Sequence, residues 1–338
     1  SAELKSFYAS GRTPIENSDH TITTSEVVRA LELAKASHLT SDHYLVSAVP
    51  LGFELDDSAE WVQNPIRMSA HSMMGHYQLM MLPISTMQNL DRALKGANIG
   101  VEKMVVSCLA TAEASLLKDE KEYGACLVDI GAGTTNIAVY LDGRLALTHT
   151  LQRGGEHVTR DIAAVLQTTT EEAERIKLLY GCVDLKVVKP DHMIQFQGID
   201  GPQTISRIEL AEIIIARYEE ILTQVHQELQ RNGAIHGLYH GVVLTGDASQ
   251  IEGMVNLARQ MLGVSAHLGN PPVQVYAEEQ NQAALRRSQY ATAAGLLMFS
   301  QSDTQDTIVE STDPEKLSVF KRVGRAWSAL NNQLKSIF

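Results

Sequence analysis

The sequence predicts an α/β protein with more than one domain. Its 338 residues are enough for two domains with sizeable cores, and its 44% apolar and 20% charged residues are ordinary for a globular chain. Short apolar runs typical of strands alternate with segments in which apolar residues recur every three or four positions, the spacing of amphipathic helices. The clearest of these elements is a strand, a turn and a second strand in the middle of the chain.

Charge and cysteine content exclude some classes of protein. The net charge of −12 gives no electrostatic footprint for nucleic acid, so we expect no nucleic-acid partner. The three cysteines, Cys108, Cys126 and Cys182, are odd in number and lack metal-ligand spacing, which favours free thiols in a reducing cytosol. No signal peptide opens the chain, and no apolar run is long enough to span a bilayer.

The first part of the chain, residues 1–82, predicts a small α/β unit. Thr23 and Glu26 form a capping-box pattern that opens a helix. Residues 43–49 and 72–82 predict strands. Beyond this unit, the pattern predicts the following elements: a helix over 85–97, a strand over 101–107 and a helix over 111–117.

Residues 126–140 are the stretch around which the rest of the chain is organised. The run 126–130 predicts a short buried strand, Gly131 and Gly133 predict a tight turn, and 137–140 predict a second strand. Strand rather than helix follows the turn, which distinguishes it from a P-loop or a dinucleotide-binding turn.

A turn of this composition suits a phosphate group. Its glycines let the backbone approach closely and its N–H groups form an anion nest, while Thr134 and Thr135 add hydroxyl donors. Asp129 precedes the turn, where its carboxylate would hold Mg²⁺ through water. An ordinary glycine-rich hairpin is the alternative, but the aspartate, glycines and paired threonines together favour nucleotide binding.

A second glycine pair follows the hairpin. Gly154 and Gly155 precede a helix predicted over 157–166, and a helix start of this kind suits a phosphate because of its free N–H groups and dipole. A plain loop explains the pair equally well. Further along, a helix opens at Thr169 and ends at Gly181.

The next segments complete the pattern of the body. Residues 183–205 are strand-like and polar, and Ser206 with its acidic partner opens a long helix that ends at Arg231. Residues 242–245 predict a buried strand that ends in a glycine turn at Gly246.

The motif from Asp129 to Thr135 looks like the second phosphate motif of the actin/Hsp70/sugar-kinase superfamily, and its wider context resembles the FtsA family of actin-like bacterial division proteins. The resemblance covers essentially the whole chain. It implies an actin-like ATPase fold of two RNase H-like halves that binds ATP with Mg²⁺. The superfamily's first phosphate turn, Asp-x-Gly-(Thr/Ser), does not occur before residue 126, so we expect an incomplete N-terminal half or a segment upstream of Ser1.

The resemblance also implies further site residues. Glu174 and Lys177 match an Ala-Glu-x-Ile-Lys pattern that reaches the ribose and adenine, although alone they would be a surface ion pair. Gly246 resembles the start of the adenosine motif, with Asp247 where a second glycine is expected, so its side chain would crowd the purine or repel phosphate. Vigorous hydrolases of the superfamily place Gln or Glu at the Cys108 position, so we expect slow hydrolysis or none.

By the same resemblance, the chain divides into the subdomains of the family. The segment called 1C takes part in self-association and in contacts with later division proteins, and subdomain 2B receives the acidic tail of FtsZ, the tubulin-like division filament. Arg217 is our predicted contact for that tail. The predicted boundaries are 1–82 for 1C, 83–124 for the remainder of 1A, 125–166 and 240–299 for 2A, 167–239 for 2B, 300–314 for a disordered linker and 315–338 for an amphipathic helix.

The C-terminal segment differs from the body in charge. Residues 300–314 are polar and acidic, typical of a linker. From Glu315 onward five basic residues and one acidic residue give +4, which leaves −16 for the body. A basic amphipathic helix that carries Trp and Phe suits an anionic membrane surface, while a helix docked on the body is the alternative. The predicted membrane-binding residues are Phe320, Lys321, Arg322, Val323, Arg325, Trp327, Leu330 and Leu334.

The resemblance, together with the C-terminal segment, implies a peripheral tether on the cytoplasmic face of the bacterial inner membrane at the division septum. It would bind ATP, self-associate and anchor FtsZ through its C-terminal helix. An ATP-hydrolysing enzyme of the Hsp70 or sugar-kinase type is one alternative, against which Cys108 argues. A PilM-like pilus-assembly scaffold is another, which would not need the amphipathic tail.

Overall fold

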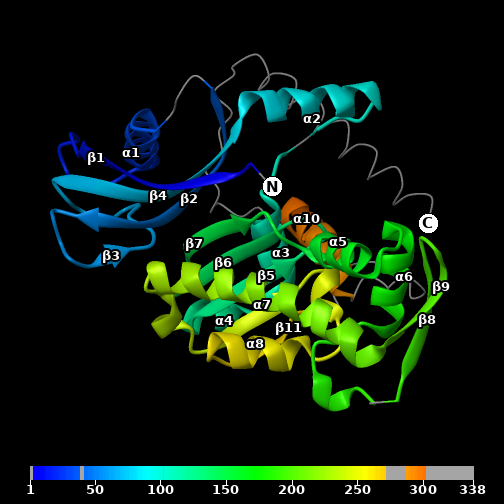
Figure 1. Ribbon diagram of the computed structural model, residues 1–338. Helices are drawn as coiled ribbons and strands as arrows, with labels where there is room; N and C mark the ends of the chain where they lie inside the picture. Colours follow the sequence, from blue (N-terminus) through cyan, green and yellow to red (C-terminus); the bar gives the residue numbers. More distant parts are fainter. Residues whose placement is uncertain (1–2, 39–41, 102, 190, 272–286, 302–338) are drawn as a thin grey trace, which may run out of the picture.

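The structure is a computed structural model, shown in Figure 1. It describes residues 3–38, 42–101, 103–189, 191–271 and 287–301. The predicted helix over 315–338, and all but the first two residues of the predicted linker, lie outside the described residues.

The N-terminal part is an antiparallel sheet covered on one face by a helix. The strand order is β1-β4-β2-β3, and α1 packs across β1 and β4 (Figure 1). The helix begins where the sequence predicts, because Thr23 and Glu26 form the capping box. The bounds are β1 Lys5–Pro14, α1 Thr24–Ala36, β2 His43–Leu55, β3 Trp61–Val62 and β4 Ser72–Pro83.

The strand β1 was not predicted, because its inward-facing positions carry small residues. Ala9, Gly11 and Thr13 face α1, and a Cβ added at Gly11 would lie 2.0 Å from the Ala30 carbonyl oxygen. The helix therefore lies very close to this strand, and the alternation of large apolar and polar residues that identifies most half-buried strands is weak here.

The centre of the molecule is a five-stranded sheet with the order β11-β10-β5-β6-β7. Strands β10 and β11 run parallel to β5, while β6 and β7 continue from it as antiparallel neighbours. Both faces of β5 are covered, so all six of its residues are buried. The bounds are β5 Ala125–Ile130, β6 Thr135–Leu141, β7 Arg144–Leu151, β10 Gly241–Thr245 and β11 Ala266–Leu268.

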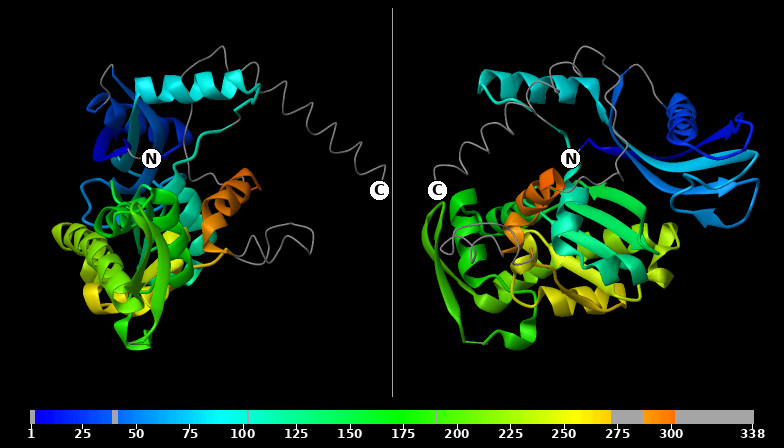
Figure 2. Two further views of the ribbon diagram at one scale, coloured as in Figure 1. Left: turned by 45° about the vertical axis from the view of Figure 1, so that its right-hand side comes forward. Right: turned by 180° about the vertical axis from the view of Figure 1, so that it is seen from behind.

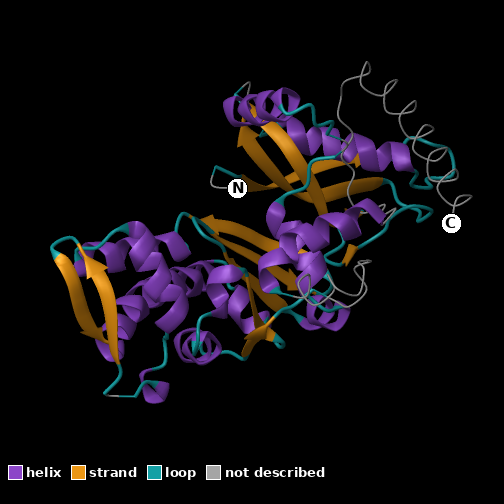
Figure 3. Cartoon of the chain, turned by 90° about the vertical axis from the view of Figure 1, so that its right-hand side faces the viewer, coloured by secondary structure: helices purple, strands orange, loops and turns teal. Residues whose placement is uncertain are grey.

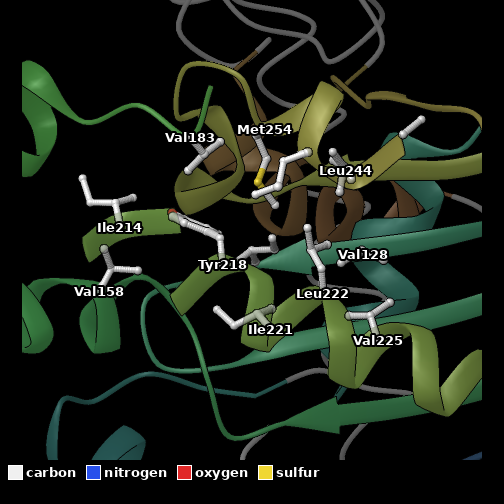
Figure 4. Close-up of a cluster of buried hydrophobic side chains, with 14 of the residues drawn as sticks. Val128, Val158, Val183, Ile214, Tyr218, Ile221, Leu222, Val225, Leu244 and Met254 are labelled. Atoms are coloured by element: carbon white, nitrogen blue, oxygen red, sulfur yellow. The ribbon is translucent and has the colours of Figure 1, made fainter. Parts of the chain in front are cut away.

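One face of this sheet packs against α5, α7 and α8, and the other against α3 and α10. Figure 4 shows side chains of α7 meeting those of the strands in the larger core. On the opposite face α3 and α10 lie side by side, and a Cβ added at Gly295 would stand 1.7 Å from the Ala110 carbonyl oxygen. The bounds are α3 Ser107–Ser115, α4 Lys118–Tyr123, α5 Gly155–Leu166, α7 Arg207–Arg231, η2 Ala234–Gly237, η3 Asp247–Gln250, α8 Met254–Leu262, η4 Ser288–Tyr290 and α10 Ala291–Gln301.

A small unit of α6, β8 and β9 lies at one end of the molecule, and the N-terminal sheet lies at the other (Figure 3). Strands β8 and β9 form a two-stranded antiparallel hairpin beside α6 and the start of α7. Helix α2 projects from the end of β4, and no residue of it is buried (Figure 2). The bounds are α2 Ile84–Gly96, α6 Thr170–Tyr180, η1 Leu185–Val187, β8 Met193–Gly198 and β9 Gly201–Ser206.

Two predictions between residues 101 and 117 are wrong. Residues 103–106 pair with no strand in the described part of the chain, so the expected strand over 101–107 does not form. A strand is stabilised by the neighbouring strands with which it pairs, and the composition of a segment does not show whether such a neighbour exists. The following helix, α3, begins at Ser107 rather than Thr111 and ends two residues before the predicted end.

Candidate functional site

The central hairpin has the predicted arrangement of strand, turn and strand. Ile130 pairs with Thr135, and the Gly131 N–H donates to the Thr134 carbonyl at 2.9 Å, which closes the turn. Ala132 and Gly133 at its tip are exposed, and a Cβ added at Gly133 would meet no atom within 4 Å. The tip of this turn is therefore open to a ligand.

The second glycine pair is used differently from the first. The Gly155 N–H donates to the Gly131 carbonyl at 2.9 Å, and the Glu156 N–H donates to the Ala132 carbonyl at 2.8 Å. A Cβ added at Gly154 would stand 2.5 Å from the Gly131 oxygen. The start of α5 is thus docked on the back of the turn, and two of its N–H groups are occupied by the protein itself.

The two threonines of the turn have different environments. Thr135 is fully buried, and its hydroxyl donates to the Arg153 carbonyl at 2.9 Å. Thr134 is partly exposed, and its side chain makes no hydrogen bond within the described residues. Of the two, Thr134 is the one whose hydroxyl remains available to a ligand.

Asp129 lies buried at the end of β5, on the side of α3. It accepts hydrogen bonds from the Thr111 hydroxyl at 3.3 Å and from the Asn136 side chain. Burial raises the pKa of its carboxyl, and these two hydrogen bonds oppose that rise. Thr245, directly beside it in the sheet, has a buried hydroxyl that finds no hydrogen-bond partner among the residues that the structure describes.

This donor set fits the manner in which Mg²⁺ is bound beside phosphates. Magnesium keeps most of its waters and takes one or two carboxylates together with substrate phosphates. Asp129 supplies one carboxylate, and Thr111 and Thr245 supply neutral hydroxyl oxygens beside it, while the Asn136 amide donates to the carboxylate. Within the described residues no group of three or more His, Cys, Asp or Glu side chains is arranged to bind a metal ion.

A cleft of about 1060 Å³ opens beside the turn, between α5, α6 and η3. Glu174 and Lys177 lie in its wall with Gly155 and Ala132. The Lys177 ammonium pairs with the Glu174 carboxylate at 2.7 Å and donates to the Gly155 carbonyl at 3.1 Å. This pair is therefore part of the cleft wall and is bonded to the start of α5. A simple surface ion pair would make no further contact with the protein.

Gly246 brings the end of β10 against the end of β5. Its φ is +85°, and a Cβ there would lie 2.4 Å from the Ile130 carbonyl oxygen and 2.6 Å from Asp129 Oδ1, so only glycine fits. Asp247 follows directly and lines the cleft. The turn at 131–134, the start of α5 and the start of η3 thus converge on one cleft.

Sequence reasoning missed several residues that hold this site together. The Thr159 hydroxyl accepts a hydrogen bond from Lys177 Nζ at 2.7 Å and itself donates to Glu174. The Tyr218 hydroxyl donates to the Ala248 carbonyl at 2.7 Å. Thr159 follows Gly155 by four residues, which places both on one face of the helix, and this spacing is the sequence signal that could have identified Thr159. No sequence signal identifies Tyr218.

Arg217 lies on α7, outside the cleft, and is already paired. Its guanidinium binds both carboxylate oxygens of Asp161 on α5, at 2.6 and 2.9 Å, and also pairs with Glu220. Its side chain is 22% exposed. An acidic ligand at this position would share or compete with Asp161.

The predicted membrane-binding residues, 320–334, lie outside the described residues. Among the helices that the structure describes, none is long and apolar enough to cross a bilayer.

The structure resembles solved actin-like proteins at low sequence identity. A PilM–PilN type IV pilus biogenesis complex matches with a TM-score of 0.59 at 17% identity, over 88% of this chain and 77% of that chain. MreB5 of Spiroplasma citri bound to ADP matches with a TM-score of 0.51 at 17% identity, over 63% of this chain and 64% of that chain. The fold is therefore an actin-like ATPase fold.

The sequence matches two family models, one described as Cell division protein FtsA over residues 126–295 and one as SHS2 domain inserted in FTSA over residues 1–81. Among curated relatives, FtsA of Pseudomonas aeruginosa is 32% identical over 91% of this chain and 75% of its own length. FtsA of Escherichia coli K12 is 31% identical over 86% and 70%, and FtsA of Bacillus subtilis 32% over 86% and 64%. The chain belongs to the FtsA family of cell division proteins.

Proposed function

We propose that this chain is an ATP-binding, actin-like tether of the division septum. It binds ATP with Mg²⁺, self-associates on the cytoplasmic face of the inner membrane as a peripheral protein, and anchors FtsZ filaments there. The observation that carries the nucleotide part is the convergence of the open turn, the Glu174–Lys177 pair and the start of η3, directly after Gly246, on one cleft. Family membership carries the part that concerns division.

Each element of the cleft has a role in this proposal. The turn N–H groups and Thr134 bind the phosphates, Glu174 and Lys177 bind the ribose and adenine, and Asp129 holds Mg²⁺ through water. When bound, the metal would neutralise phosphate charge. This chain's own residues orient the nucleotide and supply the anion nest.

We infer that hydrolysis is slow at most. Cys108 is buried, and burial together with the nearby Asp129 raises the pKa of its thiol to about 12, so it stays protonated at neutral pH. Glu113, the nearest acidic residue of α3, is engaged with Lys121 at 2.6 Å. The thiol is therefore no general base at neutral pH and Glu113 is held by Lys121, which favours a nucleotide-dependent scaffold over a sugar kinase or an Hsp70-type enzyme.

The partners follow from the proposed subdomains. Residues 1–82 form the 1C subdomain, which contributes to self-association and to contacts with later division proteins, and residues 167–239 form 2B. The acidic tail of FtsZ would bind 2B, with Arg217 as one contact. Beyond the linker at 300–314, the basic helix over 315–338 would bind anionic lipid.

The FtsZ contact is tested by neutralising Arg217. Charge reversal there would also oppose Asp161, so Arg217→Gln is the cleaner change. We expect the affinity for an FtsZ tail peptide to fall about tenfold, or about 1.4 kcal/mol. Arg231→Gln on the same helix is the matched control, because Arg231 pairs with Glu228 alone among the described residues and its side chain is 70% exposed. Equal binding by Arg217→Gln and the parent would place the contact elsewhere on 2B, and no binding by the parent would reject the FtsZ proposal.

The membrane proposal is tested with Trp327→Glu on vesicles of anionic and of neutral lipid. Burying an aromatic side chain at the interface contributes about 2 kcal/mol, and each basic residue adds about 1 kcal/mol on anionic lipid. We therefore expect at least a tenfold loss of cosedimentation with anionic vesicles. Asn332→Glu adds the same charge off the apolar stripe and should lose much less. Undiminished sedimentation of Trp327→Glu would contradict tethering by this helix.

A further inference from the structure

The cleft beside the turn has more acidic than basic side chains in its wall, and all its basic groups are occupied. Its acidic residues are Glu156, Glu171, Glu174, Asp247 and Glu252, and its basic residues are Arg160, Lys177 and Arg207. Arg160 pairs with Glu156 at 3.3 Å, Lys177 with Glu174 at 2.7 Å, and Arg207 with Glu252 at 2.6 Å. A phosphate that enters the cleft therefore meets no cation that is free of a carboxylate.

Asp247 is exposed and has no cation beside it within the described part of the chain. Its carboxylate accepts one hydrogen bond, from Gln250 Nε2 at 3.2 Å, and takes part in no ion pair there. Burial chiefly raises the pKa of Tyr218 in the wall of the cleft, and the charges of Glu174 and Asp247 add to that rise. Asp247 thus lines the cleft with a carboxylate that no cation of the described residues neutralises.

The backbone fixes Asp247 close to the open turn. Gly246 lies against the Ile130 carbonyl, directly before the turn, because its missing Cβ leaves that space. One residue after Asp247, the Ala248 methyl would stand 3.0 Å from a Cβ at Gly155, so the start of η3 touches the start of α5. Asp247 thus lies between Gly246, which contacts the residue before the phosphate turn, and Ala248, which contacts the start of α5.

We propose that Asp247 selects against phosphate charge in this cleft. The inference rests on the proposed nucleotide function and states which form of nucleotide the cleft accepts. The charge of Asp247 reduces the affinity that the turn gives to the phosphates, more for free ATP than for ADP, and Mg²⁺ would offset this loss by neutralising phosphate charge. The physical reason is like-charge repulsion over several ångströms, in a cleft whose cations are already paired. The preferred ligand is the magnesium complex of the nucleotide.

The test compares adenosine, ADP and ATP by isothermal titration calorimetry, with and without Mg²⁺, on the parent chain and on Asp247→Asn. Asparagine keeps the size of the side chain and removes its charge. We expect about a tenfold gain in affinity for free ATP, a smaller gain for ADP and no change for adenosine. Added salt should strengthen binding of free ATP to the parent, because it screens repulsion, and should affect the variant less.

A matched control and two contrary outcomes separate the inference from the function on which it rests. Asp200→Asn removes the same charge in the exposed β8–β9 turn, outside the lining of the cleft, and should leave all three affinities unchanged. If adenosine and ATP bind, but Asp247→Asn leaves their affinity ratio unchanged, the inference is overturned while the function stands. If no variant binds any of the three ligands, the proposed nucleotide function itself fails, and the inference fails with it.

Discussion

Two glycine-rich segments of this chain look alike in sequence and are used in opposite ways. The turn at Gly131 to Thr134 presents an exposed tip, and Gly133 there has open space around its Cα. The pair Gly154 and Gly155 is pressed against the back of that turn, and the first N–H groups of α5 donate to its carbonyls. Glycine thus serves ligand access in one segment and close packing in the other.

The comparison teaches that a phosphate site requires unoccupied N–H groups as well as glycine. A helix start offers its first N–H groups to an anion only when nothing else accepts from them. Here the Gly131 and Ala132 carbonyls already accept two of them. These two hydrogen bonds also hold the turn from behind and leave its tip exposed.

The largest expected effect on stability is at the packed glycine. In Gly154→Ala, the added Cβ would stand 2.5 and 2.6 Å from two backbone oxygens, so either the turn or the helix start must move. The φ of Gly154, −169°, suits any residue, so the effect is steric. We expect the free energy of unfolding to fall by about 2–3 kcal/mol in urea titrations. An unchanged urea midpoint would show that the contact is loose.

A smaller effect is expected at the buried threonine of the turn. Thr135→Val keeps the shape but removes the donor to the Arg153 carbonyl, which should cost about 1–2 kcal/mol of unfolding free energy. Thr134→Val is the matched control, since this side chain makes no hydrogen bond in the described residues, and it should stay within about 0.5 kcal/mol. Equal losses of melting temperature in the two variants would show that the hydroxyl of Thr135 contributes no more to stability than that of Thr134.

The smallest effect on stability is expected at the open glycine. Gly133→Ala meets no atom within 4 Å, so the unfolding free energy should change by no more than about 0.5 kcal/mol. A loss comparable with that of Gly154→Ala, measured in the same urea titration, would mean that the tip is constrained and the contrast between the two segments is false.

Sequence patterns predicted the elements that carry their own local signals. Ser206 and Glu209 cap α7 and Asn232 follows its last residue, so both ends of that helix were predicted correctly. The hairpin was predicted because two apolar runs flank a glycine turn. Strand β1 was missed, because its small residues are explained only by the close approach of α1. The strand expected at 103–106 does not form, because the sequence does not show whether a segment has a neighbouring strand to pair with.

The candidate site divides in the same way. Glu174 and Lys177, which match a motif and line the cleft, could be named from sequence, and so could Gly246, which lies directly before the cleft residue Asp247. The sequence could not show that the first N–H groups of α5 donate to the turn, because this depends on how closely the backbone of α5 approaches the backbone of the turn. Ion pairs between helices leave no local signal in the sequence, so the pairing of Arg217, the predicted contact for the FtsZ tail, with Asp161 was not predicted.

The most direct test of the account is an ATP titration, in the presence of Mg²⁺, of two variants at the open glycine. Gly133→Ala keeps the nest neutral and should bind ATP within about threefold of the parent, whereas Gly133→Asp places a carboxylate there and should lose at least tenfold. Both variants should remain as stable as the parent, because the position is open. Equal ATP affinity of Gly133→Asp and the parent would contradict the central claim that this turn binds the phosphates.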